Sequence, residues 1–219
     1  MLRGRFRSQL HFSPDRQADF IQRHGSWVSV WPCLNCPCLG DHGQPDPLCP
    51  VCKDTGRFYP VDAHYTMPLL PYHEASKPTD NEAGWWTQGV LYATLLPGTS
   101  LARNDKIIYV DVKDTYSDEV LIRGFDDTLR FTHGVELELV ATREMTYRAG
   151  QDYRLQSPNT IQWVPGGNAP AFNKKYSCRY RANPEYLMWG DSPRLRVEHR
   201  RGQAPEVMLM RADKIGDVP

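Results

Sequence analysis

Residues 174–182, KKYSCRYRA, carry an aromatic or small apolar side chain at every second position, with charged or polar side chains between them. Residues 135–141, VELELVA, follow the same pattern over most of their length. Successive side chains of a strand point to opposite faces, so this alternation predicts strands with one buried face. The other face is expected to meet solvent or a partner protein.

Short β-rich runs of this kind fill the chain from residue 85 onward, and turn sequences such as PGTS, DTYSD and PGGNAP separate them. Proline and glycine are frequent, at 18 and 16 of 219 residues. This composition is typical of many strands and turns rather than of a helical bundle. The sequence therefore predicts a mainly β fold, an antiparallel β-barrel or sandwich. The expected strands are QGVLYATLL, DKIIYVDV, DEVLIRG, DTLRFT, VELELVA, QDYRLQ, NTIQWV, KKYSCRYRA, PRLRVEH and EVMLMRA.

One short helix is predicted near the N-terminus, over residues 13–25. Ser13 is a suitable N-cap, and Pro14 fits the first helical position. Gly25 can end the helix in a left-handed conformation. The helix is long enough to dock on another element but too short to be stable alone.

The domain organisation is predicted from two strands that enclose a cysteine-rich stretch and from a proline-rich segment after them. The strands are SWVSVW, at residues 26–31, and GRFYPV, at residues 56–61. The segment MPLLPYHEASKPTDNEAG has the composition of an extended arm or linker. The expected division is 1–66 for the helix and strand pair with a zinc knuckle at 32–55, 67–84 for the arm, and 85–219 for the barrel.

Five of the six cysteines lie between residues 31 and 59, in WPCLNCPCLGDHGQPDPLCPVCKDTGRFY. They include two CxxC pairs, and a tight CxxC turn presents two sulfurs to one side. Two such turns facing each other complete the tetrahedron of a zinc site. The preferred ligands are Cys33, Cys36, Cys49 and Cys52, with Cys38 or His42 as substitutes.

This cysteine cluster is expected to hold structural zinc, and disulfides and redox chemistry are the alternatives. The basic N-terminus is not followed by the apolar segment of a secretory signal, so we expect a reducing cytoplasm, where disulfides are disfavoured. Four protein ligands leave no position for a water molecule, so the metal is expected to hold a loop and to catalyse nothing. CPVCKDTGRFY resembles the hairpins of DnaJ-type zinc domains, although Asp54 stands where their first glycine does.

Charge and motifs provide no simple signal for several common functions, although a local basic patch stays possible on a neutral chain. Lys plus Arg equals Asp plus Glu, at 26 each, so the basic excess of a non-specific nucleic-acid binder is missing. No apolar run approaches the roughly 18 residues of a membrane span. No catalytic motif is present, Asp126 and Asp127 read as a turn, and Cys178 reads as a buried apolar residue.

Two groups of basic residues are the weaker candidate site. Their functional interpretation is contact with DNA or with an acidic partner, and the alternative is a solvated strand face balanced by acidic residues. The residues are Lys174, Lys175, Arg194, Arg196, Arg200 and Arg201.

The second half resembles small β-barrel virion proteins at the necks and tails of tailed bacteriophages. The resemblance covers about residues 145–197 and rests on YRAGQDYRLQ, NTIQWVPGGNAPAFNKKYSCRYRANPEYLMW and PRLRV. It implies a non-enzymatic subunit of the virion, assembled in the host cytoplasm. The implied role is a head–tail connector or neck (stopper-like) protein, repeated as a ring between a portal or adaptor and tail proteins, with DNA in the lumen. The competing hypothesis is a cellular zinc-ribbon module that binds nucleic acid or a protein partner.

Overall fold

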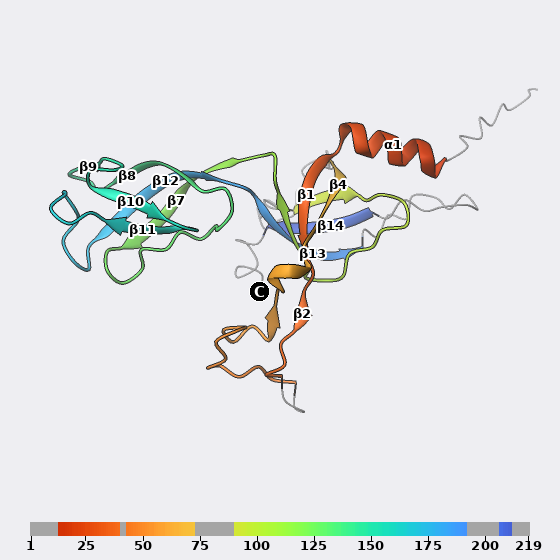
Figure 1. Cartoon of the computed structure of the whole chain (residues 1–219), viewed down its shortest axis with the longest axis horizontal. Helices are drawn as coiled ribbons and strands as arrows, with labels where there is room; N and C mark the ends of the chain where they lie inside the picture. The colour runs from red at the N-terminus through yellow and green to blue at the C-terminus, as the bar shows by residue number, and fades with distance from the viewer. Residues whose placement is uncertain (1–12, 40–42, 73–89, 192–205, 212–219) are drawn as a thin grey trace, which may run out of the picture.

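The computed structural model describes residues 13–39, 43–72, 90–191 and 206–211. The fold is mainly β and contains three bodies, each with its own buried cluster (Figure 1). We call them the barrel, the lobe (residues 110–183) and the tip (residues 33–58). The lobe and the tip project from the barrel in different directions (Figure 1).

The predicted N-terminal helix is present as α1 (Pro14–His24). The Ser13 hydroxyl accepts a hydrogen bond from the backbone of Arg16 at 3.5 Å, and Ile21 is the fully buried residue of the helix. Gly25 ends the helix in an extended conformation, with φ −77°, and not in the expected left-handed one. A Cβ atom there would lie 2.5 Å from the Ile21 carbonyl oxygen and 2.7 Å from that of Leu69, so glycine permits a close approach. Within the described residues, no helix has the length and apolar character needed to cross a membrane.

The barrel is a closed antiparallel sheet in the strand order β1-β4-β5-β14-β13-β6, in which β6 pairs back with β1. Its interior is filled by aliphatic side chains from all six strands. The strands are β1 (Ser26–Trp31), β4 (Tyr65–Tyr72), β5 (Val90–Thr94), β6 (Lys106–Tyr109), β13 (Glu185–Asp191) and β14 (Glu206–Arg211). The buried cluster is Val28, Val30, Met67, Leu69, Leu91, Ala93, Leu95, Leu101, Ile107, Tyr109, Met188, Val207 and Leu209.

The lobe is inserted between β6 and β13 and contains a four-stranded sheet in the order β7-β12-β8-β9 and a hairpin of β10 and β11. The alternation predicted for residues 174–182 is present in the last strand of the lobe. Its alternate residues Tyr176, Cys178, Tyr180 and Ala182 are buried, and the residues between them are exposed. The strands are β7 (Asp114–Ile122), β8 (Glu136–Ala141), β9 (Thr146–Tyr147), β10 (Tyr153–Gln156), β11 (Thr160–Trp163) and β12 (Lys175–Ala182).

The lobe and the barrel meet at a polar junction. The backbone N–H of Asn183 donates to the His133 carbonyl at 3.0 Å, and its side chain donates to the Tyr109 carbonyl at 2.5 Å. His133 Nδ1 lies 2.9 Å from a carboxylate oxygen of Glu185, the first residue of β13. These contacts join the loop before β8, the start of β13 and the end of β6, so they fix where the lobe leaves the barrel.

The predicted domain division is wrong at two points. Residues 65–72 form β4, although the prediction assigns 67–72 to the arm, and β4 pairs with both β1 and β5. The barrel therefore combines strands from both halves of the chain and is not formed by 85–219 alone. The prediction fails here because Pro68 and Pro71 are typical of a linker, yet both lie in β4. Residues 65–69 of β4 pair with β1 and residues 70–72 pair with β5, so each part of the strand has one partner among the described strands. A proline without a backbone N–H is tolerated in a strand that is paired on one side only. The rest of the arm, 73–84, lies outside the described residues.

Candidate metal centre

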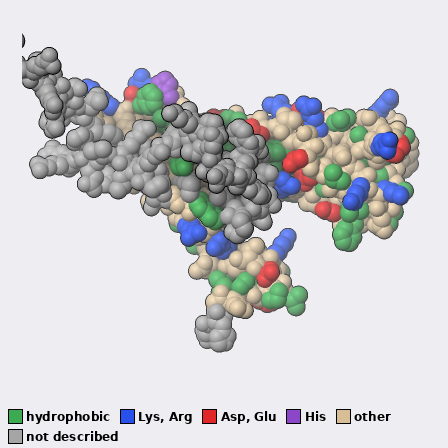
Figure 2. All heavy atoms as spheres, turned by 180° about the vertical axis from the view of Figure 1, so that it is seen from behind, with side chains coloured by type: hydrophobic (Ala, Val, Ile, Leu, Met, Phe, Trp, Pro, Cys, Tyr) green, Lys and Arg blue, Asp and Glu red, His purple; other side chains and the backbone are tan. Residues whose placement is uncertain are grey.

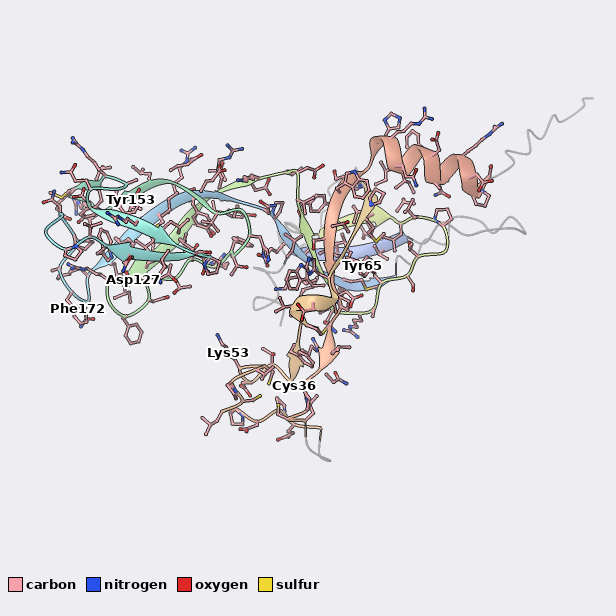
Figure 3. All side chains as sticks on the ribbon, viewed as in Figure 1. Cys36, Lys53, Tyr65, Asp127, Tyr153 and Phe172 are labelled. Carbon is pink, nitrogen blue, oxygen red and sulfur yellow. The ribbon has the colours of Figure 1, made fainter. Side chains whose placement is uncertain are left out.

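The tip is built on a short two-stranded ladder in the connection between β1 and β4, at the end of the pair where Val30 lies opposite Tyr65. Strand β2 (Leu34–Asn35) pairs with β3 (Arg57–Phe58), and a 3-10 turn η1 (Val61–Ala63) leads back to β4. Cys36 lies just beyond the ladder, inside the tip (Figure 3). The ladder is too short to bury a core, so the compact loops beyond it depend on another source of stability.

Four thiols meet inside the tip: those of Cys36, Cys38, Cys49 and Cys52. All their sulfur atoms lie within 4.8 Å of one another. The Cys36–Cys49 distance is 3.8 Å and the Cys38–Cys52 distance is 3.4 Å. Sulfurs in a tetrahedron with Zn–S bonds of about 2.3 Å lie about 3.8 Å apart. The four cysteines could therefore hold a metal ion, and their spacing is consistent with zinc.

Backbone hydrogen bonds shape the two turns that present the thiols. In the first, the N–H of Leu39 donates to the Cys36 carbonyl at 2.9 Å. In the second, the N–H of Lys53 donates to the Cys49 carbonyl at 3.0 Å. Lys53 and Asp54 follow with positive φ angles of 47° and 73°. Asp54 thus adopts the left-handed conformation that the first glycine of DnaJ-type hairpins would take more readily.

The structure brings Cys36, Cys49 and Cys52 together as expected, but it places Cys38, and not the preferred Cys33, in the fourth position. Leu34–Asn35 forms a strand, and an extended run from residue 33 to residue 36 separates its ends by about 10 Å. Cys33 stays at the base of the tip, where its N–H donates to Asp105 at 2.9 Å. The Cys36-Pro37-Cys38 spacing is the sequence signal for the pair that the structure places in the cluster. The prediction preferred Cys33 with Cys36 because that pair has the same CxxC spacing as Cys49 and Cys52.

The pKa values of two of these thiols are shifted by backbone hydrogen bonds and by burial. Backbone N–H groups of Cys52 and Val51 point at the Cys49 sulfur and lower its pKa to about 7. A backbone hydrogen bond from Asp46 favours the Cys38 thiolate, but burial and the neighbouring Cys52 thiol raise its pKa to about 12. One thiolate is thus favoured while its crowded neighbour keeps a proton. A divalent cation would stabilise all four as thiolates, and a closed set of four leaves no position for a reacting water molecule.

The other predicted site residues do not join this centre. His42 and the four arginines Arg194, Arg196, Arg200 and Arg201 lie outside the described residues. Lys174 and Lys175 are exposed at the start of β12 in the lobe. Cys178 is buried on the same strand, and burial raises the pKa of its thiol to about 12, as suits an inert core residue. All six cysteines lie in the described part of the chain and are free of disulfides.

The acidic pair Asp126 and Asp127 serves the lobe structure. The backbone of Asp126 exchanges hydrogen bonds with Ile122 and closes the turn. The Asp127 carboxylate accepts hydrogen bonds from the Tyr176 hydroxyl at 2.6 Å and from the Trp163 indole at 3.2 Å. With these partners the carboxylate is a structural acceptor inside the lobe.

Comparison with known proteins finds no family model that matches the chain and no match among curated proteins.

Proposed function

We propose that the chain is a non-enzymatic structural subunit of a tailed-phage virion. Its role would be a head–tail connector or neck protein of the stopper type, repeated as a ring between a portal or adaptor and the tail. The observation that carries this proposal is the exposure of large apolar side chains on both projections. Leu48 of the tip is 88 % exposed, and Phe125 and Phe172 of the lobe are 83 % and 69 % exposed.

These exposed side chains have the character of contact surfaces. Phe172 lies at the outer end of the lobe (Figure 3), and its ring covers Gly124, so that the two phenylalanine loops adjoin. Figure 2 shows hydrophobic side chains at the surface of the lobe and of the tip. Adjoining exposed aromatic side chains, as at Phe125 and Phe172, are typical of surfaces that bind other proteins. A subunit enclosed by neighbours would bury them.

The residues behind the phage resemblance support a scaffold role. Asp152, in the GQDY turn, accepts backbone hydrogen bonds from Arg148 at 2.8 Å and from Asn168 at 2.9 Å. These contacts, which hold one turn against a loop, lower the pKa of the Asp152 carboxyl. Glu185, in NPEY, holds the lobe–barrel junction through His133. Both motif residues therefore hold loops together through hydrogen bonds, which is a structural role.

The metal in this proposal is zinc in a structural role. Four cysteine ligands are a usual form of structural zinc site, and the ion would supply the tip with the cross-link that its two-residue strands cannot. The tip would then be a stiff projection that presents Leu48 to a neighbouring protein. Contact with DNA in the lumen would involve the exposed Lys174 and Lys175 of the lobe.

Electron micrographs of particles labelled with an antibody against this chain test the proposal. Label at the junction of head and tail is the expected result. Particles without label would contradict a virion role. A purified monomer that binds oligonucleotides tightly and in a salt-dependent way would favour the cellular zinc-ribbon hypothesis instead. A monomer alone is compatible with the proposal, because ring formation can require the portal as a template.

A further inference from the structure

A cleft lies at the base of the tip, where the tip, the barrel and the lobe–barrel junction meet. Its volume is about 650 Å³, within the range of ligand-sized pockets. The tip supplies Lys53, Arg57 and Phe58, and the barrel supplies Lys106 from β6. Lys53 extends from the tip on the side of the lobe (Figure 3). The cleft adjoins the thiol cluster, because Cys52, one of the four clustered cysteines, also contributes to its lining.

The charged side chains that line this cleft are basic, although the chain as a whole has no net charge. Its lining includes Lys53, Arg57, Lys106 and His133 but no aspartate or glutamate. Glu185 does not line the cleft, but its carboxylate lies 3.9 Å from the Lys106 ammonium, whose charge it offsets, and 2.9 Å from His133 Nδ1. Lys53 and Arg57 are in no ion pair among the described residues. Two cations at the rim are therefore available for an anionic partner.

The aromatic side chains of the cleft already contact neighbouring groups, and Phe58 packs against the cysteine cluster. One face of Trp31 is covered by the His64 ring, at 4.7 Å and 14° between planes. One face of Tyr59 is covered by the Lys106 ammonium, at 4.7 Å from the ring centre. Binding of single strands depends on free aromatic faces, so these contacts argue against nucleic acid as the occupant.

The rest of the cleft lining includes exposed apolar side chains that can contact a peptide. Val51 and Val61 line the cleft and are 61 % and 69 % exposed, so they can cover an apolar side chain of a partner. Both residues of β3 line the cleft, whereas neither residue of β2 does. Strand β3 pairs with β2 on one edge and has no other strand partner in the described part of the chain. The Thr55 hydroxyl accepts a hydrogen bond from the Arg57 N–H at 3.4 Å and donates one to the Arg57 carbonyl at 3.2 Å, so we expect side chains rather than strand addition to hold a partner in this cleft.

We propose that this cleft binds an extended acidic segment of a neighbouring protein in the assembly. A large apolar side chain of the segment would lie against Val51 and Val61, and flanking carboxylates would meet Lys53 and Arg57. The inference deepens the proposed function and rests on it, because it says how one subunit holds the next. The metal would contribute by fixing the tip wall of the cleft.

Fluorescence anisotropy of the metal-loaded full chain tests this site. The probe is a fluorescein-labelled synthetic peptide with one tryptophan between aspartate and glutamate residues, and the same peptide with lysines in place of the acidic residues is the reference. Only the acidic probe is expected to bind. The Lys53→Glu/Arg57→Glu variant should lower its affinity about tenfold or more, as the loss and reversal of two rim charges predicts.

Matched variants control for net charge and for surface hydrophobicity. Arg143→Glu/Arg154→Glu makes the same charge change at exposed lobe positions and should leave binding unchanged. Val51→Gln/Val61→Gln should weaken binding, whereas Leu48→Gln, an exposed tip residue outside the cleft, should not. The valine pair keeps the test valid if the charge-reversed variant fails to fold.

Equal affinity for the acidic and basic probes, no binding of either, or an equal effect of test and control variants would overturn the proposal. Tighter binding of an oligothymidylate than of the acidic peptide would overturn it in favour of a nucleic-acid site. The measurement uses the unassembled chain, whereas the labelled micrographs test assembly. Failure of the cleft is therefore distinguishable from failure of the virion role.

Discussion

The fourth ligand of the candidate metal centre can be tested with two cysteine variants, Cys38→Ser and Cys33→Ser. Cys38→Ser removes a thiol that lies 3.4 Å from Cys52, inside the cluster. Cys33→Ser removes a thiol at the base of the tip, on the far side of the β2–β3 ladder. Both changes replace sulfur by oxygen, so they are matched in chemistry and differ in place alone. Metal binding should be weakened by the first change and not by the second.

The expected size of the effect follows from the number of ligands. Structural zinc contributes about 10–16 kcal/mol in zinc-finger peptides, so an equal share for each of four ligands is about 3 kcal/mol. That share corresponds to about a hundredfold in affinity. Cys38→Ser should therefore lower zinc affinity about a hundredfold. Cys33→Ser should leave it unchanged, because the Cys33 thiol is outside the group of four sulfurs.

Competition with a chromophoric zinc chelator under reducing conditions measures both affinities, and circular dichroism checks that the β structure is retained. Similar losses in the two variants would show that Cys33 shares the site. A loss confined to Cys33→Ser would refute the geometric reasoning and restore the ligand set preferred from CxxC spacing.

Three further predictions concern the tip, the core of the lobe and the lobe–barrel junction. Removing the metal with a chelator should expose the tip thiols to a thiol reagent, while the aromatic circular dichroism of the other two bodies persists. The reason is that the three buried clusters share no residue. Cooperative loss of all structure would contradict this prediction. Tyr180→Phe should lower the free energy of unfolding by about 1.5–3 kcal/mol, because its buried hydroxyl donates to the Glu119 carboxylate at 2.6 Å; an unchanged urea midpoint would contradict it. Burial disfavours the Glu185 carboxylate, but the His133 hydrogen bond and the Lys106 charge hold its pKa below the ordinary 4.5. Its contribution to stability should therefore be present above pH 4.5 and be lost as the pH falls below that value, and Glu185→Gln should flatten this acid limb of a urea-midpoint profile.

Most strands could be predicted because their signal is local. The alternation in β12 depends on side chains pointing to opposite faces of one strand, and any six to eight residues display it. The capped helix α1 was predictable for the same reason, since Ser13 and Gly25 act within one turn of it. Strand β4 was missed because its prolines satisfy the rules for a linker as well as those for a half-paired strand.

The sequence by itself determined that the chain is mainly β and that a cysteine cluster able to bind metal lies between two strands, since both follow from spacing over a few residues. Tertiary structure alone decided that β6 pairs back with β1 and closes the barrel, because strand pairing joins residues far apart in the chain. It also decided that Cys38 takes the place of Cys33. CxxC spacing makes the two alternatives look alike, and the extended ladder at Leu34–Asn35 holds one thiol away from the other four. The cleft beneath the tip exists for the same reason, because its walls come from bodies that meet only in the folded chain.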